Sequence, residues 1–244
     1  YRFAARFGFA IDPATGAAAR ALGPHLDCVS AERIQEELLK LLAAPRPGSY
    51  LEPAVLAIIL PELEPEKQPE RFAELCRTID RIEPTAKNVP ARLAALLWPL
   101  GEAGARKALR KLKCSNALTD EVTALEREAP GTPGSEMQLT AKRLLGRYEL
   151  QTIQRLTALC SARHPEQTGG FAALRAEAER LTAENACCRV SQLAVNGRDL
   201  MAAGVRPGPG LRQVLNALLE TVITGQTPNE KDALLAAAAQ FSAS

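Results

Sequence analysis

Aromatic residues are scarce in this sequence, at 4% of its 244 residues, whereas Ala, Leu, Glu and Arg are abundant. Strands favour aromatic and β-branched side chains, and the abundant residues favour helices. The composition therefore predicts an all-α fold. The hydrophobic content of 46% is enough to bury a sizeable core, either in one large domain or in two or three small ones.

Ligands for soft metals are also few. The sequence has two histidines, His25 and His164, to which we assign no role, and six cysteines without a Cys-x-x-Cys pair. This pattern disfavours both a disulfide framework and a zinc site. We interpret the cysteines as reduced, small core residues, which predicts a cytoplasmic location. They are Cys28, Cys76, Cys114, Cys160, Cys187 and Cys188.

Long uncharged apolar runs are absent, and no charged segment followed by an apolar run opens the chain. The sequence therefore predicts neither a membrane span nor a signal peptide. An initiator Met is also missing, and Tyr1 opens inside a helical pattern without a capping residue, so we expect an upstream segment. The formal net charge is only +2, which means that any basic surface must be local.

Helix signals recur along the whole chain. Asp12 is a good N-cap before Pro13, and Ser30 is a good N-cap before a run with apolar residues at helical spacing. Pro and Gly residues separate the patterns, which predicts an elongated array of helix hairpins with short turns. The expected helices are 2–9, 13–22, 31–42, 51–59, 70–80, 89–97, 102–111, 116–127, 136–146, 149–160, 171–184, 211–224 and 229–240.

Three stretches together resemble the bacterial CCA-adding enzymes, a tRNA nucleotidyltransferase family with poly(A) polymerase relatives. The first is Tyr1–Phe9, which is similar to the helix that leaves the family's nucleotide-binding region. The second is Val29–Ile34 with the following 36–42, which is similar to the family's neck motif. The third is similar to the family's tail and consists of Val195–Leu200, Gly204, Arg206–Leu211, Gly225 and Asn229.

The resemblance implies a neck over residues 1–62, a helical body over 63–147 and a tRNA-binding tail over 148–244. The family's catalytic head, with its metal-binding carboxylates and its motif for selecting ATP or CTP, would lie upstream of Tyr1. The sequence itself agrees, because it contains neither a Gly-rich phosphate loop nor an Asp-x-Asp pair suited to two Mg²⁺ ions. We therefore assign no catalytic residue, metal or cofactor to this chain and expect it to be inactive alone, with Mg²⁺ and ATP or CTP used by the full-length enzyme.

One position departs from some relatives. There the helix similar to Leu96–Gly101 carries a His-Asp pair that binds a metal for phosphohydrolysis, whereas this sequence has Trp98 and Pro99. We accordingly expect no hydrolase activity from the body.

Two groups of residues are candidates for RNA binding. Five cations fall within eight residues, and Arg106, Arg110 and Lys113 are spaced to share one helix face. A solvated face is the simpler interpretation, and a stripe that follows phosphates is the alternative. The complete first group is Arg106, Lys107, Arg110, Lys111 and Lys113.

The second group is a turn that opens a helix. Arg206, Gly208 and Gly210 could bring backbone N–H groups and a positive charge to a phosphate, or the turn could be only structural. In the neck motif, Ser30, Glu32 and Arg33 are most simply a capped helix start, and the resemblance implies that they support the nucleotide site from below.

The expected function is thus the neck, body and tail of a CCA-adding enzyme that adds CMP and AMP to tRNA 3′ ends. The expected partner is tRNA, gripped at its acceptor stem and T-arm, with no DNA and no membrane. A poly(A) polymerase of the same superfamily remains the alternative enzyme. A helical interaction scaffold without any RNA role remains the alternative outside enzymes.

Overall fold

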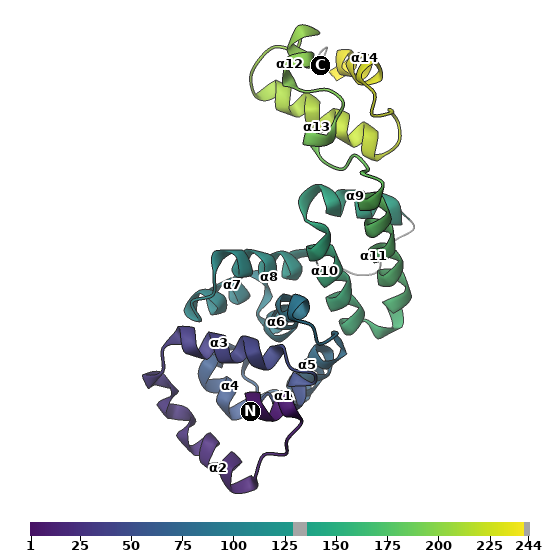
Figure 1. The fold of residues 1–244 in the computed structure, drawn as a ribbon. Coiled ribbons are helices and arrows are strands. Elements are labelled where there is room, and N and C mark those ends of the chain that lie inside the picture. The colour runs from purple at the N-terminus through teal and green to yellow at the C-terminus, as the bar shows by residue number, and fades with distance from the viewer. Residues whose placement is uncertain (129–135, 242–244) are drawn as a thin grey trace. The chain divides into compact units, whose positions relative to one another are not determined.

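The computed structural model describes residues 1–128 and 136–241, which form α-helices and short 3-10 helices without a strand (Figure 1). The prediction of an all-α fold is confirmed. The α-helices before residue 129 are α1 Arg2–Phe7, α2 Pro13–Leu22, α3 Ala31–Leu42, α4 Pro53–Ile59, α5 Pro69–Arg81, α6 Val89–Leu97, α7 Gly101–Lys111 and α8 Asn116–Glu128. Those after residue 135 are α9 Met137–Arg147, α10 Leu150–Arg163, α11 Thr168–Ala183, α12 Gly197–Ala202, α13 Pro209–Ile223 and α14 Lys231–Phe241.

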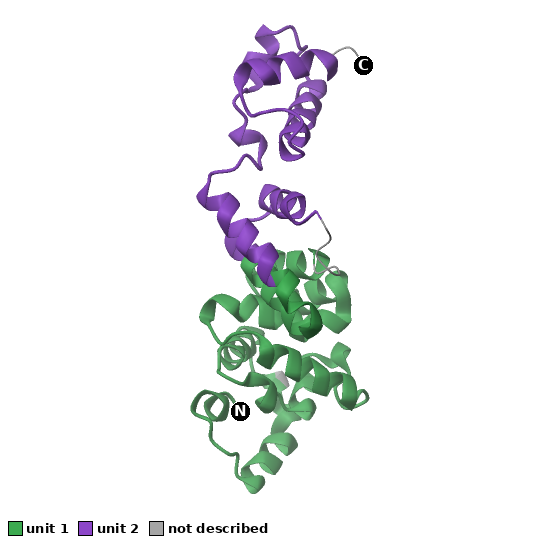
Figure 2. Cartoon of the chain, turned by 90° about the vertical axis from the view of Figure 1, so that its right-hand side faces the viewer, with its two compact units in different colours: residues 1–131, 154–171 green, residues 132–153, 172–244 purple. Residues whose placement is uncertain are grey.

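The chain divides into two compact units (Figure 2). Unit 1 consists of Tyr1–Gly131 and Gln154–Phe171, and unit 2 consists of Thr132–Ile153 and Ala172–Ser244. Helices α10 and α11 therefore each contribute residues to both units. The division into neck, body and tail at residues 62 and 147 stays a prediction.

Helix α6 is the centre of unit 1. It packs against α3, α5, α7 and α8, and its residues from Pro90 to Leu97 are all buried. A helix that is apolar on every side is expected to lie inside a core. The exception in its sequence is Arg92, whose side chain is nevertheless fully buried.

Arg92 holds the ends of two other helices in place. Its guanidinium donates hydrogen bonds to the carbonyl oxygens of Leu42 at 2.7 Å and Ala44 at 2.6 Å, at the end of α3. It also donates to the carbonyl oxygen of Ile82 at 3.1 Å and 2.5 Å, at the end of α5. Carbonyl groups at helix C-termini lack partners within the helix. The buried guanidinium supplies them with donors, and the carbonyl oxygens in turn supply acceptors for its own N–H groups.

Unit 2 has its own core beneath α12, α13 and α14. Leu200, Val214, Leu218 and Leu234 form its buried centre. Helix α9 joins this unit through Lys142, whose Nζ donates to the carbonyl oxygen of Ile223 at 3.0 Å. The last carbonyl groups of α13 thereby gain a cationic partner.

The predicted caps are confirmed. The Asp12 carboxylate accepts from the Thr15 N–H at 2.9 Å, and the Ser30 hydroxyl accepts from the Arg33 N–H at 3.5 Å. Helix α12 was not expected from the sequence, because six residues are too few to show a helical period.

The prediction about the cysteines is right only in part. Cys160 and Cys188 are buried, and burial raises the pKa of the Cys160 thiol to about 12. Cys28 is exposed, so it is not a core residue. The other three cysteines are half-buried. Among the described residues, no helix is both long enough and apolar enough to cross a membrane.

Candidate RNA interface

Arg106 is not available as a surface cation. Helix α7 packs on α8, and the Arg106 guanidinium donates to the Asp120 carboxylate at 3.1 Å and to the Thr123 hydroxyl at 2.8 Å. The Glu102 carboxylate lies 4.0 Å away on the previous turn of α7. The charge of Arg106 is therefore compensated inside the helix pair.

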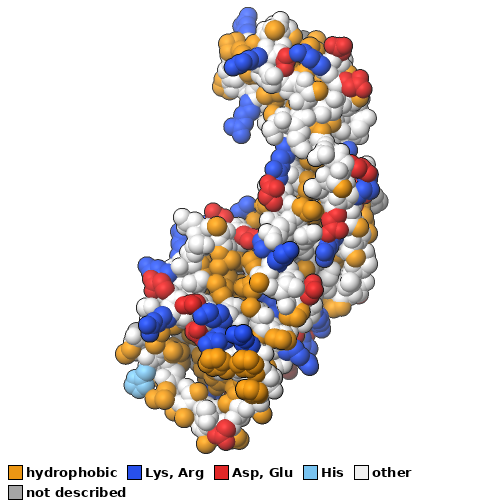
Figure 3. Space-filling model, in the orientation of Figure 1, with side chains coloured by type: hydrophobic (Ala, Val, Ile, Leu, Met, Phe, Trp, Pro, Cys, Tyr) orange, Lys and Arg blue, Asp and Glu red, His pale blue; other side chains and the backbone are white. Residues whose placement is uncertain are grey.

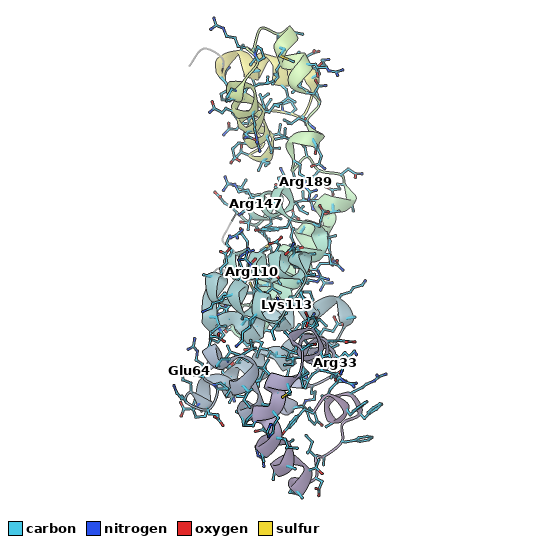
Figure 4. All side chains as sticks on the ribbon, turned by 90° about the vertical axis from the view of Figure 1, so that its left-hand side faces the viewer. Arg33, Glu64, Arg110, Lys113, Arg147 and Arg189 are labelled. Atoms are coloured by element: carbon cyan, nitrogen blue, oxygen red, sulfur yellow. The ribbon has the colours of Figure 1, made fainter. Side chains whose placement is uncertain are left out.

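The other cations of this group are exposed. Lys107, Arg110 and Lys111 are spaced i, i+3 and i+4 on α7, and none of them has an acidic partner among the residues that the structure describes. Helix α7 ends at Lys111, and Lys113 follows in a left-handed conformation with φ 56°. The expectation that Arg106, Arg110 and Lys113 share one helix face is therefore wrong (Figure 4, where Arg110 and Lys113 are labelled).

These four exposed cations, Lys107, Arg110, Lys111 and Lys113, are called the α7 cations below. Their place near the C-terminus of α7 has a structural benefit, since positive side chains there complement the helix dipole. The same benefit would be present if each cation were paired with an acidic side chain, so it does not account for the absence of such partners. On the face drawn in Figure 3, Lys and Arg side chains are interspersed with Asp and Glu side chains.

The predicted turn in unit 2 opens α13. Gly208 is its N-cap with φ 136°, Pro209 is its first residue, and no side chain caps it. Gly210 lies inside the first turn, and a Cβ added there would meet no atom within 4 Å. In this turn, only position 208 therefore requires glycine for its backbone conformation. At position 210, the absence of a side chain leaves the first N–H groups of α13 open to solvent.

Sequence reasoning missed two cations beside this turn. Arg198 on α12, Arg206 in the turn and Arg212 on the first turn of α13 are all exposed, and none has an acidic partner within the described ranges. We call these three residues the α13 cations. Arg198 belonged to the recognised tail motif, but which of its side chains face solvent could not be known before α12 was located.

The rest of the tail motif builds the support for this turn. The Asn196 side chain accepts from the N–H groups of Arg198 at 2.8 Å and Asp199 at 3.3 Å, which caps α12. Asp199 in turn accepts from Lys231 Nζ at 2.6 Å, and this hydrogen bond is the main cause of the lowered pKa of Asp199. The Asn229 amide bridges the backbone of Gln192 and Ala194.

In the neck motif, Ser30, Glu32 and Arg33 start α3, and the side chains of Glu32 and Arg33 are exposed. Arg33 also lines a groove of about 560 Å³ formed by α1, α3, α4 and the segment that precedes α3. No group of three or more His, Cys, Asp or Glu side chains among the described residues could hold a metal ion.

A family profile described as tRNA nucleotidyltransferase domain 2 matches residues 86–238. The chain belongs to the tRNA nucleotidyltransferase family. A second profile, described as a probable RNA- and SrmB-binding site of polymerase A, matches residues 8–67.

Curated relatives of this chain are CCA-adding enzymes. That of Geobacillus kaustophilus is 29% identical, with 96% of this chain and 57% of the relative covered. That of Lactiplantibacillus plantarum is 28% identical, with 96% and 56% covered. The solved CCA-adding enzyme of Bacillus stearothermophilus, in complex with CTP, is similar with a TM-score of 0.75 and 26% identity, over 98% of this chain and 59% of its own. This chain therefore spans less than two-thirds of the relatives that it matches.

Proposed function

We propose that this nucleotidyltransferase chain is the neck, body and tail of a CCA-adding enzyme, which hold tRNA while a catalytic head adds CMP and AMP to its 3′ end. The proposed boundaries are 1–62 for the neck, 63–147 for the body and 148–244 for the tail. The similarity to CCA-adding enzymes over 96% of the chain supports this proposal. In the proposed enzyme, Mg²⁺ and ATP or CTP bind to the head, and the chain alone adds no nucleotide.

The observation that carries the RNA-binding role is the location of cations without acidic partners. The whole chain has a net charge of only +2, and many of its Arg and Lys side chains pair with Asp or Glu. The α7 cations and the α13 cations have no Asp or Glu partner among the described residues. Because paired cations attract phosphate weakly, these two groups of neighbouring unpaired cations are the candidates for contact with RNA phosphates.

Such an arrangement suits A-form RNA. Its deep major groove is closed to side chains, so proteins recognise it through the backbone and through shape. The α7 cations would contact successive phosphates of one duplex stretch. The α13 cations, with the uncapped first turn of α13, would bind a phosphate through both side chains and backbone N–H groups. We propose the acceptor stem and the T-arm as the two targets.

The proposed role of Ser30, Glu32 and Arg33 is to position the neck under the nucleotide site. The hydrogen bond from the Arg33 N–H to the Ser30 hydroxyl fixes the start of α3. Glu32 in the first turn complements the helix dipole. Neither interaction would contact the nucleotide itself.

The α7 cations are tested by changing Lys107, Arg110 and Lys111 together to Ala. Binding of whole tRNA is measured at several salt concentrations, and the slope of log affinity against log salt should fall by about 0.7 to 0.9 for each phosphate that the variant no longer neutralises. The control changes three cations that have their own acids, Lys67, Arg77 and Arg175, and removes the same charge. If both triple variants lower the slope equally, the α7 cations are merely a solvated face.

The α13 turn is tested with Gly210→Val, where the backbone needs no glycine and the new side chain would cover the first N–H groups. We expect affinity for whole tRNA to fall about threefold to tenfold, with little change for an acceptor-stem hairpin that lacks the T-arm. Asn216→Val, at an exposed position further along α13, is the control. Equal losses for tRNA and hairpin would contradict the assignment of this turn to the T-arm.

A poly(A) polymerase is the second candidate, because the profile that matches residues 8–67 describes a region of polymerase A. The nucleotides incorporated by the intact enzyme separate the two. Addition of CMP and AMP to a tRNA that lacks its 3′ end supports the first candidate, and long AMP tracts on unrelated RNA support the second.

A further inference from the structure

A small cavity lies in unit 1 between α5, the end of α6 and the end of α10. Its volume is about 200 Å³, and all the residues that line it belong to unit 1. Two arginines from different helices, Arg71 of α5 and Arg163 of α10, line it together with Thr78 and Trp98. None of these residues belongs to the α7 cations or the α13 cations, so the cavity is separate from the candidate RNA interface.

The Arg163 side chain brings hydrogen-bond donors to this cavity. Its guanidinium carbon lies 3.2 Å from the centroid of the Trp98 ring, so the planar group covers a face of the indole. Among the described residues, the guanidinium accordingly has this ring contact but forms no hydrogen bond and no ion pair. Because a guanidinium that stacks through its face directs its N–H groups outward in its own plane, this edge is open to an acceptor.

The acid beside Arg163 does not neutralise it at neutral pH. Burial lowers the pKa of the Arg163 guanidinium, and the charges of Cys160 and Glu126 oppose this effect only in part. The pKa of the Glu126 carboxyl is itself raised to about 8, chiefly by burial, so Glu126 is mainly protonated at pH 7. A half-buried cation without a charged partner is unfavourable, and an anion in the cavity would supply that partner.

Arg71 supplies a second cation from α5. Its guanidinium donates to the Gln68 side chain at 3.0 Å and to the Pro99 carbonyl oxygen at 3.5 Å, which holds it beside the cavity. Both of these acceptors are uncharged, and Arg71 has no acidic partner within the described part of the chain. Its other N–H groups remain available for a ligand.

Thr78 adds a hydroxyl group to the same cavity. Its side chain is buried and lines the cavity, and its hydroxyl makes no hydrogen bond to any residue that the structure describes. By contrast, the hydroxyl groups of Thr123 and Thr182 donate to carbonyl oxygens of their own helices, at 2.8 Å in each case. The Thr78 hydroxyl can therefore donate to an acceptor inside the cavity.

Glu74 is the single acid among the described residues that line the cavity, and its charge is already compensated. The Glu74 carboxylate accepts from Arg77 at 2.8 Å and from Arg81 at 2.9 Å. One negative charge is thus accompanied by two positive charges. The surroundings of the cavity therefore stay positive and favour an anion.

The size of the cavity and its donors restrict the kind of anion. Pockets for drug-sized ligands measure roughly 300 to 1,000 Å³, so a cavity of about 200 Å³ suits a smaller ligand. Two guanidinium groups and one hydroxyl approach it from different helices. Several donors in different directions match the oxygen atoms of a tetrahedral phosphate better than the two oxygen atoms of a carboxylate.

A purely structural role accounts for only part of this arrangement. The stack of Arg163 on Trp98 connects α10 to the end of α6, and Arg81 connects α5 to α10 by donating to the Ala162 carbonyl oxygen at 3.2 Å. Neither contact uses the N–H edge of Arg163, the remaining donors of Arg71 or the Thr78 hydroxyl. These donors line one cavity and have no function there if nothing binds.

We propose that this cavity binds a phosphate group, either that of inorganic phosphate or that of a small phosphate monoester. Arg163 and Arg71 would bind its oxygen atoms from α10 and α5, and the Thr78 hydroxyl would donate to a further oxygen atom. The bound anion would connect three helices of unit 1 and stabilise their packing. The proposal does not depend on the proposed tRNA-binding function, because the α7 cations and the α13 cations take no part in it.

Isothermal titration calorimetry of the 244-residue chain with inorganic phosphate at pH 7 tests the proposal. Sodium chloride keeps the ionic strength constant. We expect saturable binding at low millimolar phosphate and a change in the fluorescence of Trp98, the sole tryptophan, over the same concentrations. Sodium acetate should produce neither signal. Absence of both signals with phosphate, or an equal response to acetate, overturns the proposal.

Two variants locate the binding site. Arg71→Gln and Arg163→Gln should each weaken phosphate binding about tenfold, because each removes a charge-assisted contact. Arg175→Gln is the control, since it removes the same charge from an exposed arginine of unit 2 that pairs with Glu179, and it should leave the affinity unchanged. If Arg163→Gln lowers the melting temperature without phosphate, the exposed Arg71 still decides the question. Equal affinities of the parent, Arg71→Gln and Arg175→Gln overturn the proposal.

An RNA end is the other source of a terminal phosphate. Acceptor-stem hairpins with a 5′-phosphate and with a 5′-hydroxyl are compared for binding to the parent chain and to Arg71→Gln. We expect no difference between the two hairpins and no effect of Arg71→Gln on the salt dependence of tRNA binding. A preference for the 5′-phosphate that is lost in Arg71→Gln assigns the cavity to RNA and overturns the proposal. The α7 cations are tested by their own triple variant, so the two proposals can fail separately.

Discussion

Replacing one buried carboxyl group, Glu126→Gln, should remove a large part of the pH dependence of stability in unit 1. Glu126 is only 9% exposed, and its Oε1 has no hydrogen-bond partner. The pKa of this carboxyl is raised from 4.5 to about 8, chiefly by burial; the charge of Arg163 opposes the increase and that of Glu102 adds to it. The folded protein therefore keeps a proton that the unfolded chain releases above about pH 4.5.

The sign follows from this difference in bound protons. Between about pH 4.5 and pH 8 the folded state binds more protons than the unfolded state, so the free energy of unfolding falls as the pH rises. At about 1.4 kcal/mol for each pH unit, the upper limit of the loss is about 5 kcal/mol, and we expect at least ~1.5 kcal/mol. Gln cannot ionise, so the variant should lack this part of the decrease.

Urea unfolding at pH 5 and pH 9, followed by the fluorescence of Trp98, measures the effect. Trp98 is the sole tryptophan of the chain and packs under the Arg163 guanidinium in unit 1, so it reports on the right part of the molecule. Glu66→Gln, at an exposed position, is the control. If wild type and Glu126→Gln lose the same stability between the two pH values, to within about 0.5 kcal/mol, the carboxyl is ionised in the folded protein and the reasoning is wrong.

Three further results are expected. Arg92→Met should destabilise unit 1 by about 3 kcal/mol or more in the same unfolding assay, because three buried carbonyl groups lose their donor. Gly48→Ala should destabilise it by about 1 to 3 kcal/mol, because a Cβ there would lie 2.3 Å from the carbonyl oxygen of Cys76, whereas Gly169→Ala meets no atom and should be tolerated. The purified 244-residue chain should incorporate no labelled nucleotide into tRNA with ATP, CTP and Mg²⁺, and any incorporation would place catalytic groups within it.

Most helices could be predicted from the sequence because their signals are local. Asp12 with Pro13, and Ser30 with the apolar spacing that follows, act within one or two turns of chain. The same reasoning missed α12, whose cap is a local signal too: Asn196 followed three residues later by Asp199. The signal was present, but it was read only as part of a family motif.

The orientation of charged side chains could not be predicted, because it depends on which helices meet. Arg106 and Lys107 are neighbours in the sequence, yet Arg106 turns toward Asp120 of α8 and Lys107 faces solvent. Arg92 is a stronger case. Its burial requires the ends of α3 and α5 to converge on α6, and no pattern within 89–97 contains that information.

The number of cations in the two groups predicts how strongly salt affects the RNA binding that these groups provide. The four α7 cations and the three α13 cations offer at most seven phosphate contacts, which corresponds to a slope of about 5 to 6 in the log-log plot. A short hairpin that reaches only the α7 cations should show a slope of about 3. A hairpin slope close to that of whole tRNA would mean that one group of cations makes all the contacts. The proposed division of labour between body and tail would then be wrong.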